Sequence, residues 1–244
     1  MNKGGPDMKE IKILHLFPKL LSLYGEYGNL AVLRRTLEEN GCTVTVETYE
    51  NGELTLDTYD FIYVGAGTED NLLEAIRRLM PYKEAIAASI ESSKLWLATG
   101  NAMTLFGASI TRGEATTDAL GCFSYTTAIF DSKRYLGDVL TAEAFGSQFV
   151  GFVNTSSVFD GIPSPLLQLQ LGSKLGNDKQ SPADGIHLHN FYGTQLIGPV
   201  LAKNPHFLAH IGSQLTGSEI TLSPDSYACK AYAIALSVLK NRMQ

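Results

Sequence analysis

Along the first hundred residues, segments with a strand-type pattern of hydrophobic positions alternate with segments that have a helix-type pattern. Short apolar or alternating runs predict four strands, at residues 11–17, 42–49, 60–64 and 95–98. Helical spacing of apolar residues fills two of the segments between them, at 29–40 and 71–92. This order of strands and helices predicts an α/β fold whose open, mostly parallel sheet carries helices on both faces.

Capping and breaking residues refine the two predicted helices. Asn29 is placed to cap the first helix, which repeats leucine at helical spacing and has Gly41 just past its end. Pro81 lies inside the second helical segment and predicts its division into two helices.

The pattern changes from about residue 120 onward. Short apolar runs separated by turn residues predict strands at 121–127, 137–142, 149–153 and 166–171, either antiparallel or extending the first sheet. Residues 172–184 read as an exposed loop, and helices are predicted at 205–216 and 224–240. Because no linker with a shifted composition appears, we expect one domain over residues 11–244, preceded by a disordered start over residues 1–10.

Composition narrows the classes of function. A chain of 244 residues with 44% hydrophobic content builds a sizeable core, which excludes disorder. Its 19 Lys and Arg against 25 Asp and Glu give a net charge of -6, which argues against nucleic-acid binding. Three widely spaced cysteines favour a reducing compartment over a disulfide framework. With no signal peptide or membrane span visible, the expected location is the cytoplasm.

Three loops follow the carboxyl ends of the predicted parallel strands, where such sheets bind ligands. They cover residues 24–29, 65–68 and 99–101. In the second loop, Gly65 and Gly67 flank Ala66 and allow backbone amides to approach a ligand as an oxyanion or carboxylate cradle. A tight strand-to-helix turn explains the same Gly-Ala-Gly triplet, and spacing alone favours that reading.

The third loop joins a strand to a helix, the arrangement in which several enzyme classes mount a nucleophile. Its residues are Thr99, Gly100 and Asn101. Thr99 is the one hydroxyl among them, and the local sequence offers it no base.

Several segments resemble class I glutamine amidotransferases of the CobB/CobQ type, and within them the GatD-type glutaminase subunits. The resemblance covers nearly the whole chain from Lys12, and its most specific parts are LYGEYGN and GTQLIGPVLAKN. The others are VGAG, LATGNAMTLFG, RYLGD, GFVN and GIHLHNFYG. It implies the amidotransferase fold and a Mur-ligase-like synthetase partner that receives ammonia from glutamine.

The resemblance also implies a catalytic Cys/His pair that this chain lacks. Gly100 stands where the family has its cysteine, and Ile197 stands where it has its histidine. Glycine has no side chain to attack an amide and isoleucine carries no proton, so the thioester route cannot operate there. The resemblance also implies that Arg134 is a retained substrate-binding arginine and that Asn154 is retained. Together with Gly65, Ala66, Gly67 and Asn101 of the loops described above, these are the candidate ligand-binding residues.

Other side chains offer weaker alternatives. None of the three cysteines lies in the third loop, where a nucleophile would be mounted. We expect each to be a small, buried, apolar residue: Cys42, Cys122 and Cys229. The histidine pairs at 187/189 and 206/210 have metal-compatible spacing but no clear third ligand, so no metal and no other cofactor is expected.

The sequence therefore favours a catalytically degenerate amidotransferase-like subunit that binds a Mur-ligase-like partner. The expected ligand of its former active-site pocket is glutamine or a related small amide. The first alternative is an active glutaminase subunit that delivers ammonia from glutamine to a synthetase partner, with a nucleophile at another position or an unusual residue such as Thr99. The second is a free-standing small-molecule sensor without a partner.

Overall fold

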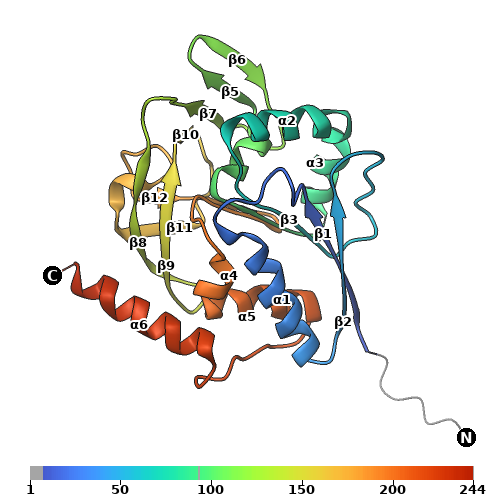
Figure 1. The fold of residues 1–244 in the computed structure, drawn as a ribbon, viewed down its shortest axis with the longest axis vertical. Coiled ribbons are helices and arrows are strands. Elements are labelled where there is room, and N and C mark those ends of the chain that lie inside the picture. Colours follow the sequence, from blue (N-terminus) through green and yellow to red (C-terminus); the bar gives the residue numbers. More distant parts are fainter. Residues whose placement is uncertain (1–7, 93, 244) are drawn as a thin grey trace, which may run out of the picture.

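The computed structural model describes residues 8–92 and 94–243, and its central layer is a six-stranded sheet (Figure 1). The strand order is β13-β14-β4-β3-β1-β2, in which β13 is antiparallel to its neighbour and the others are parallel. The strands are β1 (Glu10–Leu16), β2 (Thr43–Tyr49), β3 (Phe61–Val64), β4 (Leu95–Thr99), β13 (Ile186–Leu188) and β14 (Phe191–Thr194). The four strands predicted in the first hundred residues are confirmed.

Alternating side chains of β1, β3 and β4 enter two separate cores on the two faces of this sheet. One face is covered by α2 (Glu69–Leu79) and α3 (Lys83–Glu91), joined by the one-turn helix η2 (Met80–Tyr82) that contains Pro81. The other is covered by α1 (Tyr27–Glu39), α4 (Val200–Lys203) and α5 (Pro205–Thr216). The predicted α/β architecture and the break at Pro81 are confirmed.

The remaining strands form two four-stranded sheets beside the central one. The first has the order β10-β7-β5-β6 and the second β12-β11-β8-β9. Their strands are β5 (Ser109–Arg112), β6 (Ala115–Asp118), β7 (Thr126–Ile129), β8 (Tyr135–Ala144), β9 (Ser147–Thr155), β10 (Ser157–Asp160), β11 (Leu167–Leu171) and β12 (Ala183–Asp184). The antiparallel second half predicted from turn spacing is therefore built as separate sheets, with one parallel pair, β5 with β7.

The last helix, α6 (Tyr227–Asn241), packs on β8 and β9 rather than on the central sheet. Ser226 caps its first turn by accepting a hydrogen bond from the amide of Cys229. Of the described helices, none is long and apolar enough to cross a membrane.

Two local expectations are wrong. Asn29 does not cap α1: it lies buried inside the helix, where its Oδ1 accepts from the Leu201 amide at 2.9 Å. The segment 172–184 is not a plain loop, because it holds the short helix η4 (Ser173–Leu175) and reaches β12, which pairs with β11. The first seven residues of the predicted disordered start, 1–7, lie outside the described part of the chain, whereas Glu10 begins β1.

Candidate functional site

The turn after β4 has the backbone of a nucleophile elbow with no side chain at its tip. Gly100 adopts φ +63°, in the left-handed region, as β4 passes into the 3-10 helix η3 (Gly100–Phe106). A Cβ added to Gly100 would lie 2.7 Å from the Ala66 Cβ and 3.0 Å from Ile197 Cγ2. Carbon atoms do not approach to 2.7 Å without displacement. The fold thus brings Gly100, Ala66 and Ile197 together and fills the space that a nucleophile would need.

The glycines of the 65–67 segment accommodate the protein's own chain. A Cβ on Gly67 would lie 2.3 Å from Leu21 Cδ2, and one on Gly65 would lie 3.0 Å from the Glu26 Cβ. The amide of Leu23 donates to the carbonyl of Ala66 at 3.0 Å. This close packing accounts for both glycines as parts of a tight turn, the alternative that spacing alone favoured.

Asn101 is bound to the same turn. Its Oδ1 accepts from the Gly67 amide at 3.1 Å, and its Nδ2 donates to the Gly67 carbonyl at 2.8 Å. The Gly67 N–H group therefore already has an acceptor, so an oxyanion would have to displace the Asn101 side chain to use it.

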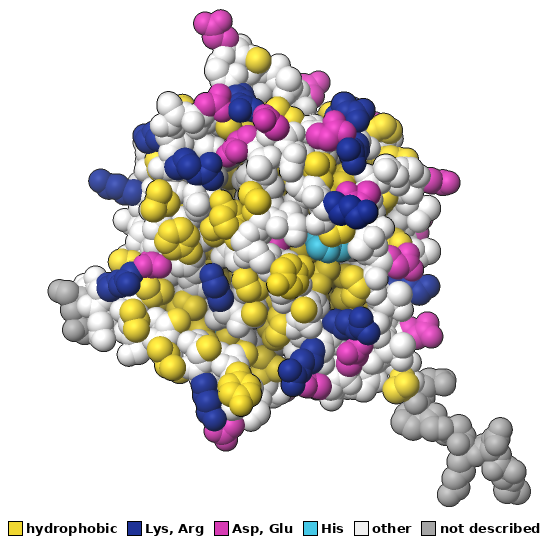
Figure 2. All heavy atoms as spheres, viewed as in Figure 1, with side chains coloured by type: hydrophobic (Ala, Val, Ile, Leu, Met, Phe, Trp, Pro, Cys, Tyr) yellow, Lys and Arg dark blue, Asp and Glu magenta, His cyan; other side chains and the backbone are white. Residues whose placement is uncertain are grey.

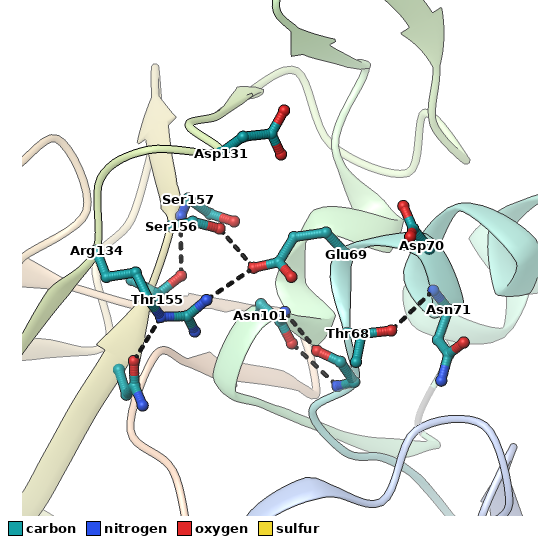
Figure 3. Close-up of polar contacts among 12 residues, drawn as sticks. Thr68, Glu69, Asp70, Asn71, Asn101, Asp131, Arg134, Thr155, Ser156 and Ser157 are labelled. Atoms are coloured by element: carbon teal, nitrogen blue, oxygen red, sulfur yellow. Dashed lines mark hydrogen bonds and ion pairs between the residues drawn. The ribbon is translucent and has the colours of Figure 1, made fainter.

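Arg134 and Asn154 lie together at the rim of this site, and Figure 3 shows the Arg134 side chain directed toward Glu69. Arg134 Nε donates to Asn154 Oδ1 at 2.9 Å, and its Nη1 lies 3.3 Å from Glu69 Oε1 at the start of α2. Ser156 Oγ donates to the same Glu69 oxygen at 2.6 Å. These contacts lower the pKa of the Glu69 carboxyl despite its partial burial. Two of the predicted ligand-binding residues thus meet, with the arginine already paired to a carboxylate.

Glu26 is the residue that sequence reasoning missed. It is fully buried behind the elbow, where its carboxylate accepts from Thr99 Oγ1 and from the Tyr63 hydroxyl. Its other oxygen accepts from the Gly198 amide at 3.1 Å. Burial outweighs these hydrogen bonds and raises the pKa of Glu26 to about 7. The available signal was an acidic residue flanked by tyrosine and glycine at the carboxyl end of the first strand.

Thr99 is held by this buried network rather than presented to solvent. Its hydroxyl also lies 3.0 Å from the Tyr63 hydroxyl, and its exposed fraction is 0%. The Glu26 carboxylate could act as a base for the Thr99 hydroxyl. However, a nucleophile must reach its substrate, and this hydroxyl is not accessible to one.

The chain is similar to glutamine-hydrolysing subunits named GatD. It is 26% identical over 208 residues to the GatD subunit of lipid II isoglutaminyl synthase from Streptococcus pneumoniae (strain ATCC BAA-255 / R6), covering 83% of this chain and 79% of that one. It is 29% identical over 200 residues to the GatD subunit from Staphylococcus aureus (strain N315), covering 81% of each. No family model matches the chain.

A solved glutamine amidotransferase shares the fold at a TM-score of 0.55 and 16% identity, covering 84% of this chain and 98% of that one. This likeness confirms the predicted glutamine amidotransferase-like fold.

The three cysteines of the chain all lie outside the elbow. Cys42 is buried beside β2, Cys229 lies in α6, and Cys122 lies in the segment before β7. Burial raises the pKa of the Cys122 thiol to about 12, which disfavours the reactive thiolate. None of the three is part of the elbow.

The histidines pack among aromatic rings. His187 stacks on Tyr192 at 4.4 Å between centroids, and His210 Nε2 lies 3.1 Å from the Tyr192 hydroxyl. His189 sits in the turn between β13 and β14 with φ +53°. Among the residues that the structure describes, no three His, Cys, Asp or Glu side chains are grouped to hold a metal.

Proposed function

We propose that this chain is a catalytically degenerate, GatD-like amidotransferase subunit of the CobB/CobQ type, which acts with a Mur-ligase-like synthetase in amidating a peptidoglycan precursor or a related substrate. The proposal rests on its similarity to two GatD subunits and on the missing Cys/His pair. The observation that carries the degenerate status is the packing of Ala66 and Ile197 against Gly100, which leaves no volume for a side chain at that position.

The rim residues support a retained ligand contact. Arg134 is about half exposed and remains beside Asn154. We propose that glutamine or a related small amide binds there without being hydrolysed, with the Arg134 guanidinium facing the carboxylate of the ligand.

The deciding experiment measures ammonia release from glutamine by the protein alone and with its ligase partner, together with labelling by a glutamine-analogue electrophile. We expect no release and no labelled residue, and stable co-purification with a Mur-ligase-domain protein. Because Thr99 is the hydroxyl of the elbow loop and is bonded to the buried carboxylate of Glu26, the Thr99→Val variant is the control. Glutamine hydrolysis that this variant abolishes would establish the alternative, an active glutaminase.

A further inference from the structure

A second site candidate lies away from the elbow, at the beginning of β8. An open hollow of about 600 Å³ is formed there by residues 133–136, by the end of η4 and by residues 178–180. Its lining carries four cationic side chains and one carboxylate, in a chain whose net charge is -6.

Lys179 supplies a half-buried positive charge to this hollow. Its Nζ donates to the carbonyls of Leu175 and Gly176 and to Gln195 Oε1, at 3.3, 2.7 and 2.6 Å. All three N–H groups are thereby used, and no carboxylate among the described residues lies within ion-pair distance of the ammonium. The nearest compensation is indirect, through Gln195 Nε2, which donates to Asp184 at 3.1 Å.

The backbone of Lys179 is held in an unfavourable region to place this charge. Its φ is +62°, the left-handed conformation that L-residues other than glycine seldom adopt. Strain of this kind persists where the surrounding structure enforces it, often at ligand sites. A half-buried lysine with a left-handed backbone and three hydrogen bonds on its ammonium group is not a freely solvated surface charge.

The ring of Tyr135 joins this lysine to the rim. Lys133 Nζ lies 4.7 Å from the ring centroid and Lys179 Nζ lies 5.3 Å from it, so the two ammonium groups are no more than about 10 Å apart. Lys133 and Lys174 are exposed, and neither forms an ion pair with a described residue. They provide free donors facing the hollow.

One carboxylate offsets part of the positive charge in the hollow. Asp178 directs Oδ1 to the amides of Gln180 and Ser181 at 2.8 and 2.7 Å, which lowers the pKa of its carboxyl and keeps it ionised. The Arg134 guanidinium is turned to Asn154 and Glu69, so it belongs to the elbow rim. The hollow thus sets one half-buried lysine and two exposed lysines against a single carboxylate.

We propose that this hollow binds a pyrophosphate-type anion, either free or as the end of a larger ester. Lysine is a point-charge phosphate ligand, and several lysines lining one hollow suit the multiple negative charges of two linked phosphates better than the single charge of a carboxylate. The site goes beyond the proposed function: Arg134 is the residue that its lining shares with the elbow rim, and the lysines tested below are not part of that rim.

The test is calorimetric titration of inorganic pyrophosphate, and in parallel of a nucleoside diphosphate, into the full-length protein at low salt. We expect one saturable site whose dissociation constant rises at least about tenfold in the Lys133→Ala/Lys174→Ala variant. The matched control, Lys83→Ala/Lys240→Ala, removes the same charge elsewhere and should bind as the wild type does. Tighter binding of one probe identifies the free or the esterified source.

Both variant pairs lie on the surface, so thermal melting should show that they fold. No saturable binding of either probe, or equal weakening by both double variants, would overturn the proposal. So would binding of an acidic peptide under conditions where neither phosphate probe binds.

Discussion

Gly100 shows how one residue can combine two constraints. Its φ of +63° favours glycine, and the crowding by Ala66 and Ile197 excludes a side chain independently of φ. Gly113 separates the two effects, because its φ is +62° and nothing lies within 4 Å of its would-be Cβ.

We therefore expect Gly100→Ala to destabilise the protein more than Gly113→Ala. The shared conformational cost is about 1 kcal/mol, and overpacking at Gly100 adds roughly 1–3 kcal/mol. Ala66→Gly should recover part of the additional loss when combined with Gly100→Ala. Unfolding free energies from urea denaturation measure these differences. Equal losses of unfolding free energy in Gly100→Ala and Gly113→Ala would contradict the expected steric clash at Gly100.

The same crowding sharpens a restoration experiment. Gly100→Cys with Ile197→His would install the Cys and His that the family resemblance implies at these positions, yet the new Cβ would contact the Ala66 methyl. The Ala66→Gly change is therefore needed in the same variant.

At the scale of elements, α6 is attached by a small part of its surface. Leu239 is 7% exposed and packs with Leu140 and Val150, whereas Ile234 on another side of the helix is 67% exposed. Tyr232 adds a hydrogen bond from its hydroxyl to the Gln148 carbonyl at 2.7 Å. Hydrophobic side chains remain visible along this helix in Figure 2.

Truncating the buried contact should loosen the helix, and truncating the exposed one should not. We expect Leu239→Ala to cost about 2–3 kcal/mol and to speed amide hydrogen exchange throughout α6. Ile234→Ala should change stability by less than about 0.5 kcal/mol, because alanine has the higher helix propensity. Hydrogen exchange followed by mass spectrometry measures both. Unchanged exchange in Leu239→Ala would show that other contacts hold α6.

For the whole molecule, buried ionisable groups give opposing dependences of stability on pH. Burial raises the pKa of Glu26 to about 7, so the folded state binds the extra proton and stability is lost as pH rises from 4.5 through 7. Burial lowers the pKa of His15 and of His206 to about 4, so the unfolded state binds the extra proton. The contribution of these two histidines to the stability of the folded state is lost as the pH falls from 6.5 to 4.

We therefore expect the stability of the wild type to fall as the pH is lowered from 6.5 to 4.5, because two histidines with lowered pKa values outweigh one carboxyl with a raised pKa. Glu26→Gln should make stability fall more steeply as the pH is lowered. The substitution removes about 3 kcal/mol by which protonation of Glu26 stabilises the folded state at low pH. His206→Phe should shift the slope in the opposite direction. Thermal melting over this range measures the profiles, with the exposed Glu84→Gln as control. Parallel profiles for Glu26→Gln and the wild type would show that Glu26 titrates in its ordinary range.

Local pattern determined much of this protein. Apolar runs placed β1 to β4, Pro81 placed the break between α2 and α3, and the motif comparison placed glycine at the elbow. These features depend on neighbours in sequence, so the chain itself carries the signal. The addition of β14 beside β4 was not visible, because nearly a hundred residues separate two strands that meet only in the folded sheet.

Only the tertiary structure decided which polar groups meet. The contact of Glu26 with Thr99 joins positions 73 residues apart, and the hollow around Lys179 gathers lysines from separate segments. Packing also decided that Gly65 and Gly67 make room for residues 21–26. Such contacts arise when distant segments close on one another, and no local spacing encodes that closure.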